Sequence, residues 1–363
     1  MWVSKKVSFH ALFTLFLLLG VGIVLTVFSQ KLGEGVRQGL SLCGELVIPS
    51  LFVFLCFCEW ACGSGKIQRV SSVLQRLFRF LFGKGFCGST PLLLCLIGGY
   101  PMGASALAVL HQKQMMGKDL VKRLSLWIFC PSPAFVITGV GQGMLGSLKA
   151  GVVLWCGCVV SCLLTGMVIC RFPMGLHNDS CRTFFNTEAQ SPLVNAVGSA
   201  TEKMLVICGT VILVGGILSL VNGLPIPYQM KQGFHLFLEV TNGCSYLSAK
   251  GGSLAELGSV LMFGGIGTHL QCKMLLGGNF PPYKVYVTVR ICQTVITYLL
   301  ITLFCFCFPQ VAQTLSLGIT PTVGTVSVLP SVGLLATCFV FLCSLHQKPI
   351  FRRNHCEKSG ICS

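Results

Sequence analysis

Gly98-Gly99-Tyr100-Pro101-Met102-Gly103 interrupts an apolar segment that runs over residues 87–111. Proline lacks the amide hydrogen of the helical ladder and glycine is a weak helix former, so a helix is expected to break here. Basic residues flank the segment on both sides: Lys66, Arg69, Arg76, Arg79 and Lys84 before it, and Lys113, Lys118, Lys122 and Arg123 after it. Two cytoplasmic flanks exclude a single crossing of a bilayer. The segment is therefore predicted to be a re-entrant hairpin, which enters and leaves the membrane on one side.

The composition of the whole chain also indicates a membrane protein. Of its 363 residues, 53% are hydrophobic and 10% are charged, whereas soluble proteins contain about 25% charged residues. An ordinary soluble enzyme is thereby excluded. Apolar runs near the roughly 20 residues that cross a bilayer predict eight spans: 8–28, 40–62, 124–147, 148–171, 204–222, 254–272, 285–308 and 330–346. A second re-entrant hairpin is predicted over 234–250, with Thr241-Asn242-Gly243 at its break.

The basic residues orient this arrangement in the membrane. A net charge of +16 is also found in nucleic-acid binders, but here the lysines and arginines sit in short loops between apolar segments, so no nucleic-acid partner is expected. With both termini in the cytoplasm, twenty of the 26 basic residues are cytoplasmic, five are outside and Arg290 lies within a span. The first apolar run lacks an A-x-A-like end and is interpreted as a retained helix rather than a signal peptide. We expect a multi-pass protein of the cell membrane.

Neither a metal, a cofactor nor a catalytic residue is predicted. The 22 cysteines are scattered through apolar runs without the spacing of a zinc site, and they are interpreted as small buried hydrophobic residues. No nucleophile elbow, phosphate-binding loop, His-Glu-x-x-His motif or nucleotide fingerprint occurs in a suitable context. The chain is therefore not expected to be an enzyme.

The order of the segments suggests an internal repeat. Span 40–62, hairpin 87–111 and spans 124–147 and 148–171 recur as span 204–222, hairpin 234–250 and spans 254–272 and 285–308, entered from the opposite side. Inverted repeats of this kind are a transporter architecture. The fold class is thus predicted to be all-α and polytopic with an inverted-topology repeat. The parts are a first helix at 1–30, one half at 31–171, a cytoplasmic linker at 172–202, the second half at 203–308, and an outer loop, last helix and basic tail at 309–363.

Four predicted breaks could hold a solute, because interrupted helices expose backbone groups near the midplane of the membrane. The candidate substrate-binding residues are Gly99, Tyr100, Pro101, Gly103 and Ser105 at the first break, Pro131, Ser132 and Pro133 at the second, Glu239, Thr241, Asn242 and Gly243 at the third, and Gly265, Thr268, His269 and Gln271 at the fourth. The alternative is that these glycines and prolines only kink helices and let them pack closely.

Four ionisable residues lie in apolar segments, and three of them have two possible roles. Glu239 is expected to bind the solute or a coupling proton, because an unpartnered carboxylate in a membrane costs about 2.5 kcal/mol or more; alternatively, amides at the hairpin tip satisfy it. His269 either relays a proton with Glu239 or is a satisfied interior histidine. Glu59 is expected near a membrane edge and in contact with solvent. Arg290 either neutralises a buried carboxylate or reaches the interface.

A set of motifs carries a resemblance to a known family. They are Ile48-Pro49-Ser50-Leu51-Phe52, Gly98 to Ala104, Pro131-Ser132-Pro133-Ala134-Phe135-Val136, Leu238-Glu239-Val240-Thr241-Asn242-Gly243, and Phe263-Gly264-Gly265 leading to His269-Leu270-Gln271. From about Gly39 to Phe308 the chain resembles the sporulation integral membrane protein family typified by YlbJ, within the wider group that shares a nucleoside-transporter and FeoB-type gate domain. The family often has Asn before the proline-containing break, where this chain has Cys130 and Pro131.

The resemblance implies a protein of endospore-forming bacteria, made in the mother cell and needed for the spore cortex, but it names no substrate. The leading hypothesis is a permease of the mother-cell or outer forespore membrane that moves a small polar solute by rocking of two halves, with any coupling ion left open. The alternative is a non-transporting factor that supports envelope assembly through other sporulation membrane proteins. A passive channel is a third reading. The expected partners are the lipid bilayer and the unidentified solute.

Overall fold

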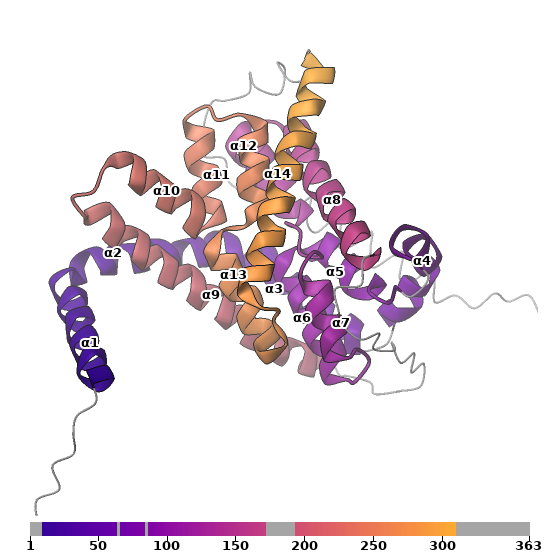
Figure 1. Cartoon of the computed structure of the whole chain (residues 1–363), viewed down its shortest axis with the longest axis horizontal. Helices are drawn as coiled ribbons and strands as arrows, with labels where there is room; N and C mark the ends of the chain where they lie inside the picture. The colour runs from indigo at the N-terminus through magenta and orange to yellow at the C-terminus, as the bar shows by residue number, and fades with distance from the viewer. Residues whose placement is uncertain (1–8, 64–65, 84–85, 172–192, 310–363) are drawn as a thin grey trace, which may run out of the picture.

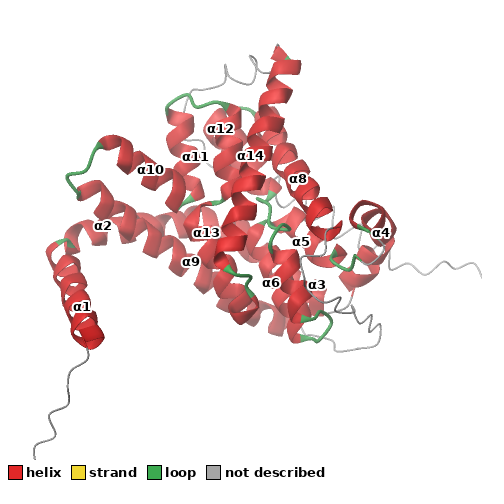
Figure 2. Cartoon of the chain, in the orientation of Figure 1, coloured by secondary structure: helices red, strands yellow, loops and turns green. Residues whose placement is uncertain are grey.

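The computed structural model describes residues 9–63, 66–83, 86–171 and 193–309 (Figure 1). Within these ranges every regular element is a helix (Figure 2). The predicted last span at 330–346 and most of the predicted linker at 172–202 lie outside the described residues. The all-α prediction is confirmed for the described part of the chain.

The chain begins with two helices that meet at a sharp bend. Helix α1 (Phe9–Val27) and helix α2 (Ser29–Leu42) lie at 77° to each other. Helix α2 then continues through a π-helical segment, η1 (Cys43–Val47), into α3 (Ile48–Gly63). At the end of η1 the amide of Ile48 bonds to the carbonyl of Cys43, five residues back. The π turn directly precedes Pro49, which has no amide hydrogen for the carbonyl four residues earlier.

Helix α9 (Leu193–Gly223) packs antiparallel along α2, η1 and α3. Gly35 lies against Gly215, and Gly39 lies against Ile212, so closely that neither position has room for a side chain. Helix α9 begins at Leu193, within the predicted linker, and is therefore longer than the predicted span 204–222. The apolar pattern did not reveal this start because the first turns of α9 carry polar residues as well as apolar ones.

The two predicted hairpins both fold back, but the second turns at Glu239, two residues before its predicted break at Thr241-Asn242-Gly243, which is helical. Helices α5 (Ser89–Gly98) and α6 (Tyr100–Gln112) turn at Gly99, whose φ of +83° favours glycine. Cys95 and Gly103, eight residues apart, pack directly against each other across this turn. Helices α10 (Tyr228–Leu238) and α11 (Val240–Ala249) turn at Glu239. Lys250 Nζ, just after α11, lies 5.0 Å from the ring centre of Tyr228 at the start of α10, so the second pair is also a hairpin. Their re-entrant placement in a bilayer stays a prediction.

The other two predicted breaks each contain a non-helical point, but most of the fourth, from Gly265 to Gln271, is helical. Between α7 (Lys118–Ser125) and the π-helical η2 (Ala134–Met144), residues 128–132, which include Pro131, have no regular secondary structure. Helices α12 (Leu254–Phe263) and α13 (Gly265–Leu276) are separated at Gly264, which has a left-handed φ of +82°. The remaining elements are α4 (Lys66–Phe82), α8 (Leu148–Arg171), η3 (Gly277–Asn279) and α14 (Tyr283–Cys307).

The last long helices of the two halves, α8 and α14, are antiparallel neighbours. Gly157 of α8 lies against Ile301 of α14, and four residues later Ser161 Oγ donates a hydrogen bond of 2.8 Å to the carbonyl of Gln293. The residue numbers thus rise along one helix and fall along the other. Helices α3 and α9, which the predicted repeat also equates, show the same antiparallel relation.

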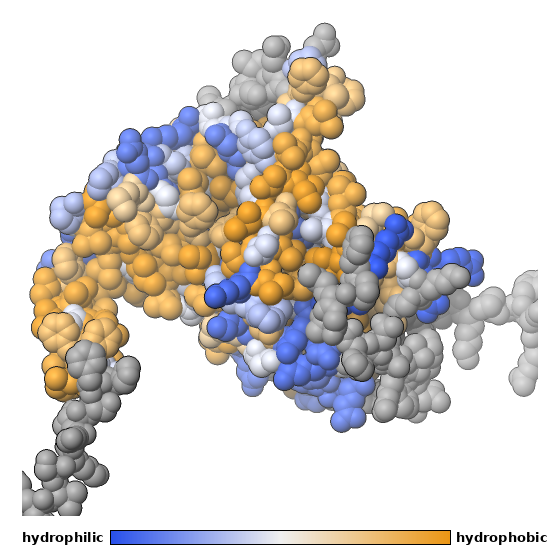
Figure 3. Space-filling model, in the orientation of Figure 1, coloured by the Kyte–Doolittle hydropathy of each residue, from blue (hydrophilic) through white to orange (hydrophobic). Residues whose placement is uncertain are grey.

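In the part of the chain that the structure describes, three helices are long and apolar enough to cross a membrane: α8, α9 and α14. There are four if the bent pair α1 and α2 forms one span. The other predicted spans within the described residues appear as shorter or interrupted helices, so the total of eight stays a prediction. In Figure 3 apolar residues cover α1, α9 and α14, whereas hydrophilic residues gather near the lower ends of α6 and α7 and around the start of α10.

Candidate functional site

Residues from all four breaks line one cavity of about 100 Å³. The first half contributes Gly98, Gly99, Tyr100, Pro101, Pro131, Ser132 and Phe135, and the second half contributes Glu239, Val240, Thr241, Thr268 and Gln271. Apolar residues close it from the side of η1, α3 and α9: Val47, Leu51, Ile207 and Val211. A cavity of this volume holds several water molecules and is smaller than the roughly 300–1,000 Å³ of drug-sized pockets. Segments far apart in the sequence therefore meet around one small, partly polar space.

Nine of the sixteen candidate residues line this cavity: Gly99, Tyr100, Pro101, Pro131, Ser132, Glu239, Thr241, Thr268 and Gln271. The other seven do not: Gly103, Ser105, Pro133, Asn242, Gly243, Gly265 and His269. Several of the seven serve packing, since Gly103 lies against Cys95 and Phe129, and Gly265 lies against the backbone of Glu239. Binding roles for all sixteen stay predictions.

Glu239 lines the cavity and also caps a helix. Glu239 is 8% exposed, and its backbone is extended between α10 and α11. The carboxylate Oε2 accepts a hydrogen bond of 2.7 Å from the amide of Asn242, so Glu239 is the N-cap of α11. Capping and the helix dipole both favour a negative charge at this position. One backbone amide at the hairpin tip thus provides a hydrogen bond to one carboxylate oxygen. The same side chain also lines the cavity.

His269 is held away from Glu239. Its ring is 1% exposed, with Nε2 2.9 Å from the carbonyl oxygen of Phe263 and Nδ1 3.4 Å from the hydroxyl of Tyr283. Because a carbonyl oxygen only accepts, Nε2 carries the hydrogen of that bond. Among the described residues no hydrogen bond joins His269 to Glu239. This environment matches that of a satisfied interior histidine.

Arg290 holds the two broken segments of opposite halves together. The residue is fully buried, and its Nη1 donates to the carbonyl of Phe129 at 2.7 Å and to that of Met262 at 3.4 Å. Further bonds run from Nη1 to Gln293 and from Nε to Tyr286. Neither sequence reading of Arg290 describes this arrangement, because it neither pairs with a carboxylate among the described residues nor reaches the surface. It satisfies carbonyl groups that the breaks leave without helical donors.

Aromatic rings and a second donor complete this arrangement. The guanidinium carbon of Arg290 lies 5.3 Å from the ring centre of Tyr100 and 5.4 Å from that of Tyr286, distances at which a cation is attracted to the ring face. The hydroxyl of Tyr100 donates to the carbonyl of Leu261, next to Met262. Tyr100 therefore forms a cavity wall with its ring and supports the fourth break with its hydroxyl.

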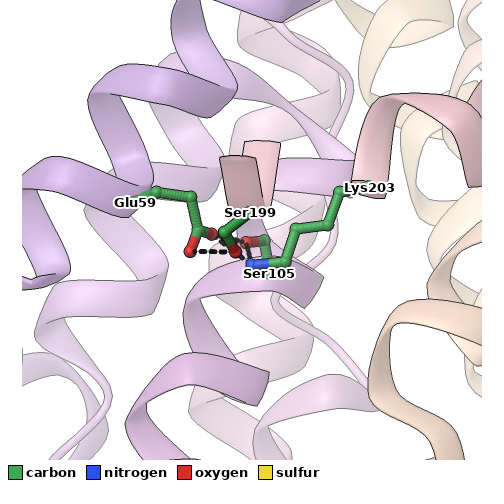
Figure 4. Close-up of polar contacts among 4 residues, drawn as sticks. All are labelled: Glu59, Ser105, Ser199 and Lys203. Atoms are coloured by element: carbon green, nitrogen blue, oxygen red, sulfur yellow. Dashed lines mark hydrogen bonds and ion pairs between the residues drawn. The ribbon is translucent and has the colours of Figure 1, made fainter. Parts of the chain in front are cut away.

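A polar cluster buried elsewhere in the bundle joins the two halves (Figure 4). Glu59 of α3 forms an ion pair with Lys203 of α9, and its carboxylate also accepts hydrogen bonds from Ser105 at 2.6 Å and Ser199 at 2.9 Å. Lys203 donates in addition to Ser105 at 3.0 Å. The Glu59 side chain is 7% exposed, so the expectation that it contacts solvent was wrong. The sequence shows opposite charges near the end of span 40–62 and just before span 204–222, but neither flanking sequence specifies the other residue as a partner.

Comparisons with known proteins add one relative. The chain is 29% identical over 131 residues to the sporulation integral membrane protein YlbJ of Bacillus subtilis (strain 168). The aligned stretch covers 36% of this chain and 32% of that protein. No family model matches the chain, and no solved structure matches it. The similarity agrees with the resemblance that the motifs carry, and the likeness to nucleoside-transporter and gate domains stays a prediction.

Proposed function

We propose that the chain is a sporulation membrane protein that moves a small polar solute through the cavity between its two halves. The observation that carries this proposal is the meeting of all four breaks around one space, with Glu239 in its wall. Uninterrupted helices would present only side chains there, whereas interrupted helices also present amide and carbonyl groups. The printed name of the similar Bacillus subtilis protein supports the link to sporulation.

The arrangement of the halves supports alternating access. Helices α3 and α9 are antiparallel, and so are α8 and α14, as expected for two halves of opposite orientation around a central site. Rocking of one half against the other would expose the cavity first to one side and then to the other. In this proposal the protein acts in the mother-cell or outer forespore membrane and supports formation of the spore cortex.

The cavity wall restricts the solute. Ser132, Thr241, Thr268 and Gln271 offer hydrogen-bonding side chains, and Glu239 offers a carboxylate, while Val47, Leu51, Ile207 and Val211 are apolar. A volume of about 100 Å³ admits a solute of few heavy atoms without rearrangement. We therefore propose a small solute that donates hydrogen bonds to Glu239, in preference to a nucleoside-sized one.

The test uses the purified full chain in liposomes. Nucleosides, amino acids and cell-wall precursors are screened for thermal stabilisation, because a ligand that binds the native state raises its stability, and the hits are assayed for saturable uptake. Glu239→Gln keeps an oxygen that can cap α11 but removes the charge, so we expect uptake to fall at least tenfold. Glu256→Gln is the control, because the Glu256 carboxylate also accepts a backbone amide at a helix start, that of the N-cap residue Ser253 of α12, and lies outside the cavity.

Two results would overturn the proposal. Normal saturable uptake by folded Glu239→Gln protein would remove Glu239 from the mechanism. Failure of every solute class to stabilise or cross would instead favour the non-transporting factor that acts through other sporulation membrane proteins.

A further inference from the structure

Helix α4 presents three distinct surfaces. Its inner surface is anchored in the protein by Gln75, Phe78 and Phe82: the amide nitrogen of Gln75 donates to the carbonyl of Phe86 at 2.8 Å, and the ring of Phe82 lies 4.9 Å from that of Trp127. Both phenylalanines are buried. The orientation of α4 about its own axis is therefore fixed by contacts along more than one turn.

The outer surface of α4 is an exposed apolar stripe. Val73 is 71% exposed, Leu77 is 53% exposed and Phe80 is 80% exposed. At 3.6 residues per turn these three side chains share one side of the helix, about opposite the anchored surface. An exposed phenylalanine beside two exposed aliphatic residues indicates a surface that another apolar phase covers.

The third surface is basic. Arg76 and Arg79 are both exposed, and at 3.6 residues per turn they fall about a quarter turn from the inner surface and from the apolar stripe. The opposite quarter holds Leu74 and Leu81, which are partly buried. Such an arrangement of surfaces suits a helix that lies in the plane of a membrane beside a spanning bundle. One side of the helix contacts the protein, the opposite side and the underside contact acyl chains, and the charged side faces the headgroups.

The position of α4 relative to the long helices also fits a helix at the membrane surface. Figure 1 shows α4 nearly end-on, whereas α8 and α14 are seen from the side, so α4 runs across the direction of these helices. Trp127, whose ring packs against that of Phe82, also lies against Gly166 of α8. Helix α8 ends at Arg171, so at 1.5 Å per residue Phe82 lies about 8 Å from that end. Amphipathic interfacial helices bury their apolar face by about 5–10 Å.

We propose that α4 is an interfacial helix that binds anionic lipid, with the stripe of Val73, Leu77 and Phe80 among the acyl chains and Arg76 and Arg79 on the headgroups. A basic residue at an anionic membrane surface contributes about 1 kcal/mol, or roughly a fivefold enrichment of anionic lipid. Two arginines then predict an enrichment of up to about 25-fold over zwitterionic lipid at this site. This surface is separate from the cavity and does not depend on the transport proposal.

The experiment places a fluorescent reporter on the stripe. The full chain with Phe80→Trp is reconstituted in liposomes that contain either brominated phosphatidylglycerol or brominated phosphatidylcholine at the same mole fraction, and the signal of the unaltered chain is subtracted. Brominated acyl chains quench tryptophan on contact. We expect stronger quenching by the phosphatidylglycerol, and a loss of that preference when Arg76 and Arg79 are replaced by Gln.

Controls separate lipid binding from a change in folding. Replacing the exposed Arg37 and Lys149 by Gln removes the same charge elsewhere and should leave the preference intact. High salt should weaken the preference in the Phe80→Trp protein without any change at the arginines. Equal quenching by both lipids, or quenching by aqueous iodide in place of lipid, would overturn the proposal.

Discussion

Replacing Lys203 by Met should destabilise the protein by about 3 kcal/mol, because it leaves the buried carboxylate of Glu59 without its cation. The side chains of this ion pair are 16% and 7% exposed, so solvent screens it weakly. Removal of one partner of a buried pair costs about 3–5 kcal/mol. We expect the lower end, since Ser105 and Ser199 would still donate hydrogen bonds of 2.6 and 2.9 Å to the carboxylate.

The assay is equilibrium unfolding of the purified chain in mixed micelles, with Glu59→Gln, Lys203→Met and the double variant compared in one cycle. Because the single changes each strand a polar group and the double change removes both charges, the double variant should lose clearly less than the sum of the two. Glu202→Gln is the control, since Glu202 is exposed and adjacent to Lys203 on α9. A loss below about 1 kcal/mol for Lys203→Met, with additive single effects, would refute a coupled buried pair.

Three further changes probe the supports of the fourth break. Arg290→Lys should cost about 3 kcal/mol, because a single ammonium cannot donate to the Tyr286 hydroxyl from the position of Nε and also keep the bonds of Nη1 to the carbonyls of Phe129 and Met262; an unfolding free energy equal to that of the unaltered chain would contradict this role. Tyr100→Phe should cost about 1–3 kcal/mol by leaving the carbonyl of Leu261 unpaired, and a carbonyl-sensitive infrared shift should accompany the loss. Gly264→Ala should lower stability by about 1–2 kcal/mol because its φ of +82° is unfavourable for alanine, which a thermal melt would reveal; an unchanged melting temperature would argue against the left-handed turn.

Local chemistry predicted the positions where the helices stop. Gly99 and Gly264 both adopt positive φ angles, and the stretch around Pro131 has no regular secondary structure, as glycine and proline in apolar segments suggest. Only the predicted repeat suggested that the breaks meet around one cavity. No local sequence pattern indicates which breaks face each other. The roles given to the residues there stay predictions.

The long-range polar contacts could not be predicted with the same certainty. Glu59 and Lys203 are 144 residues apart in the chain, and neither flanking sequence specifies the other as a partner. Arg290 was recognised as unusual within a span, but its acceptors are backbone carbonyls at Phe129 and Met262, which have no sequence signature. Hydropathy also hid the amphipathic order of α4, because an averaged apolar score does not separate its three surfaces.

The glycine contacts between α2 and α9 have a consequence for how the gene tolerates mutation. At Gly35 and Gly39 the opposing backbone occupies the volume of a methyl group, so even alanine would force the two long helices apart. At Gly20 and Gly22 of α1 a methyl group would meet nothing. A library of glycine-to-alanine variants selected for stable accumulation in the membrane should therefore lose the first pair and retain the second.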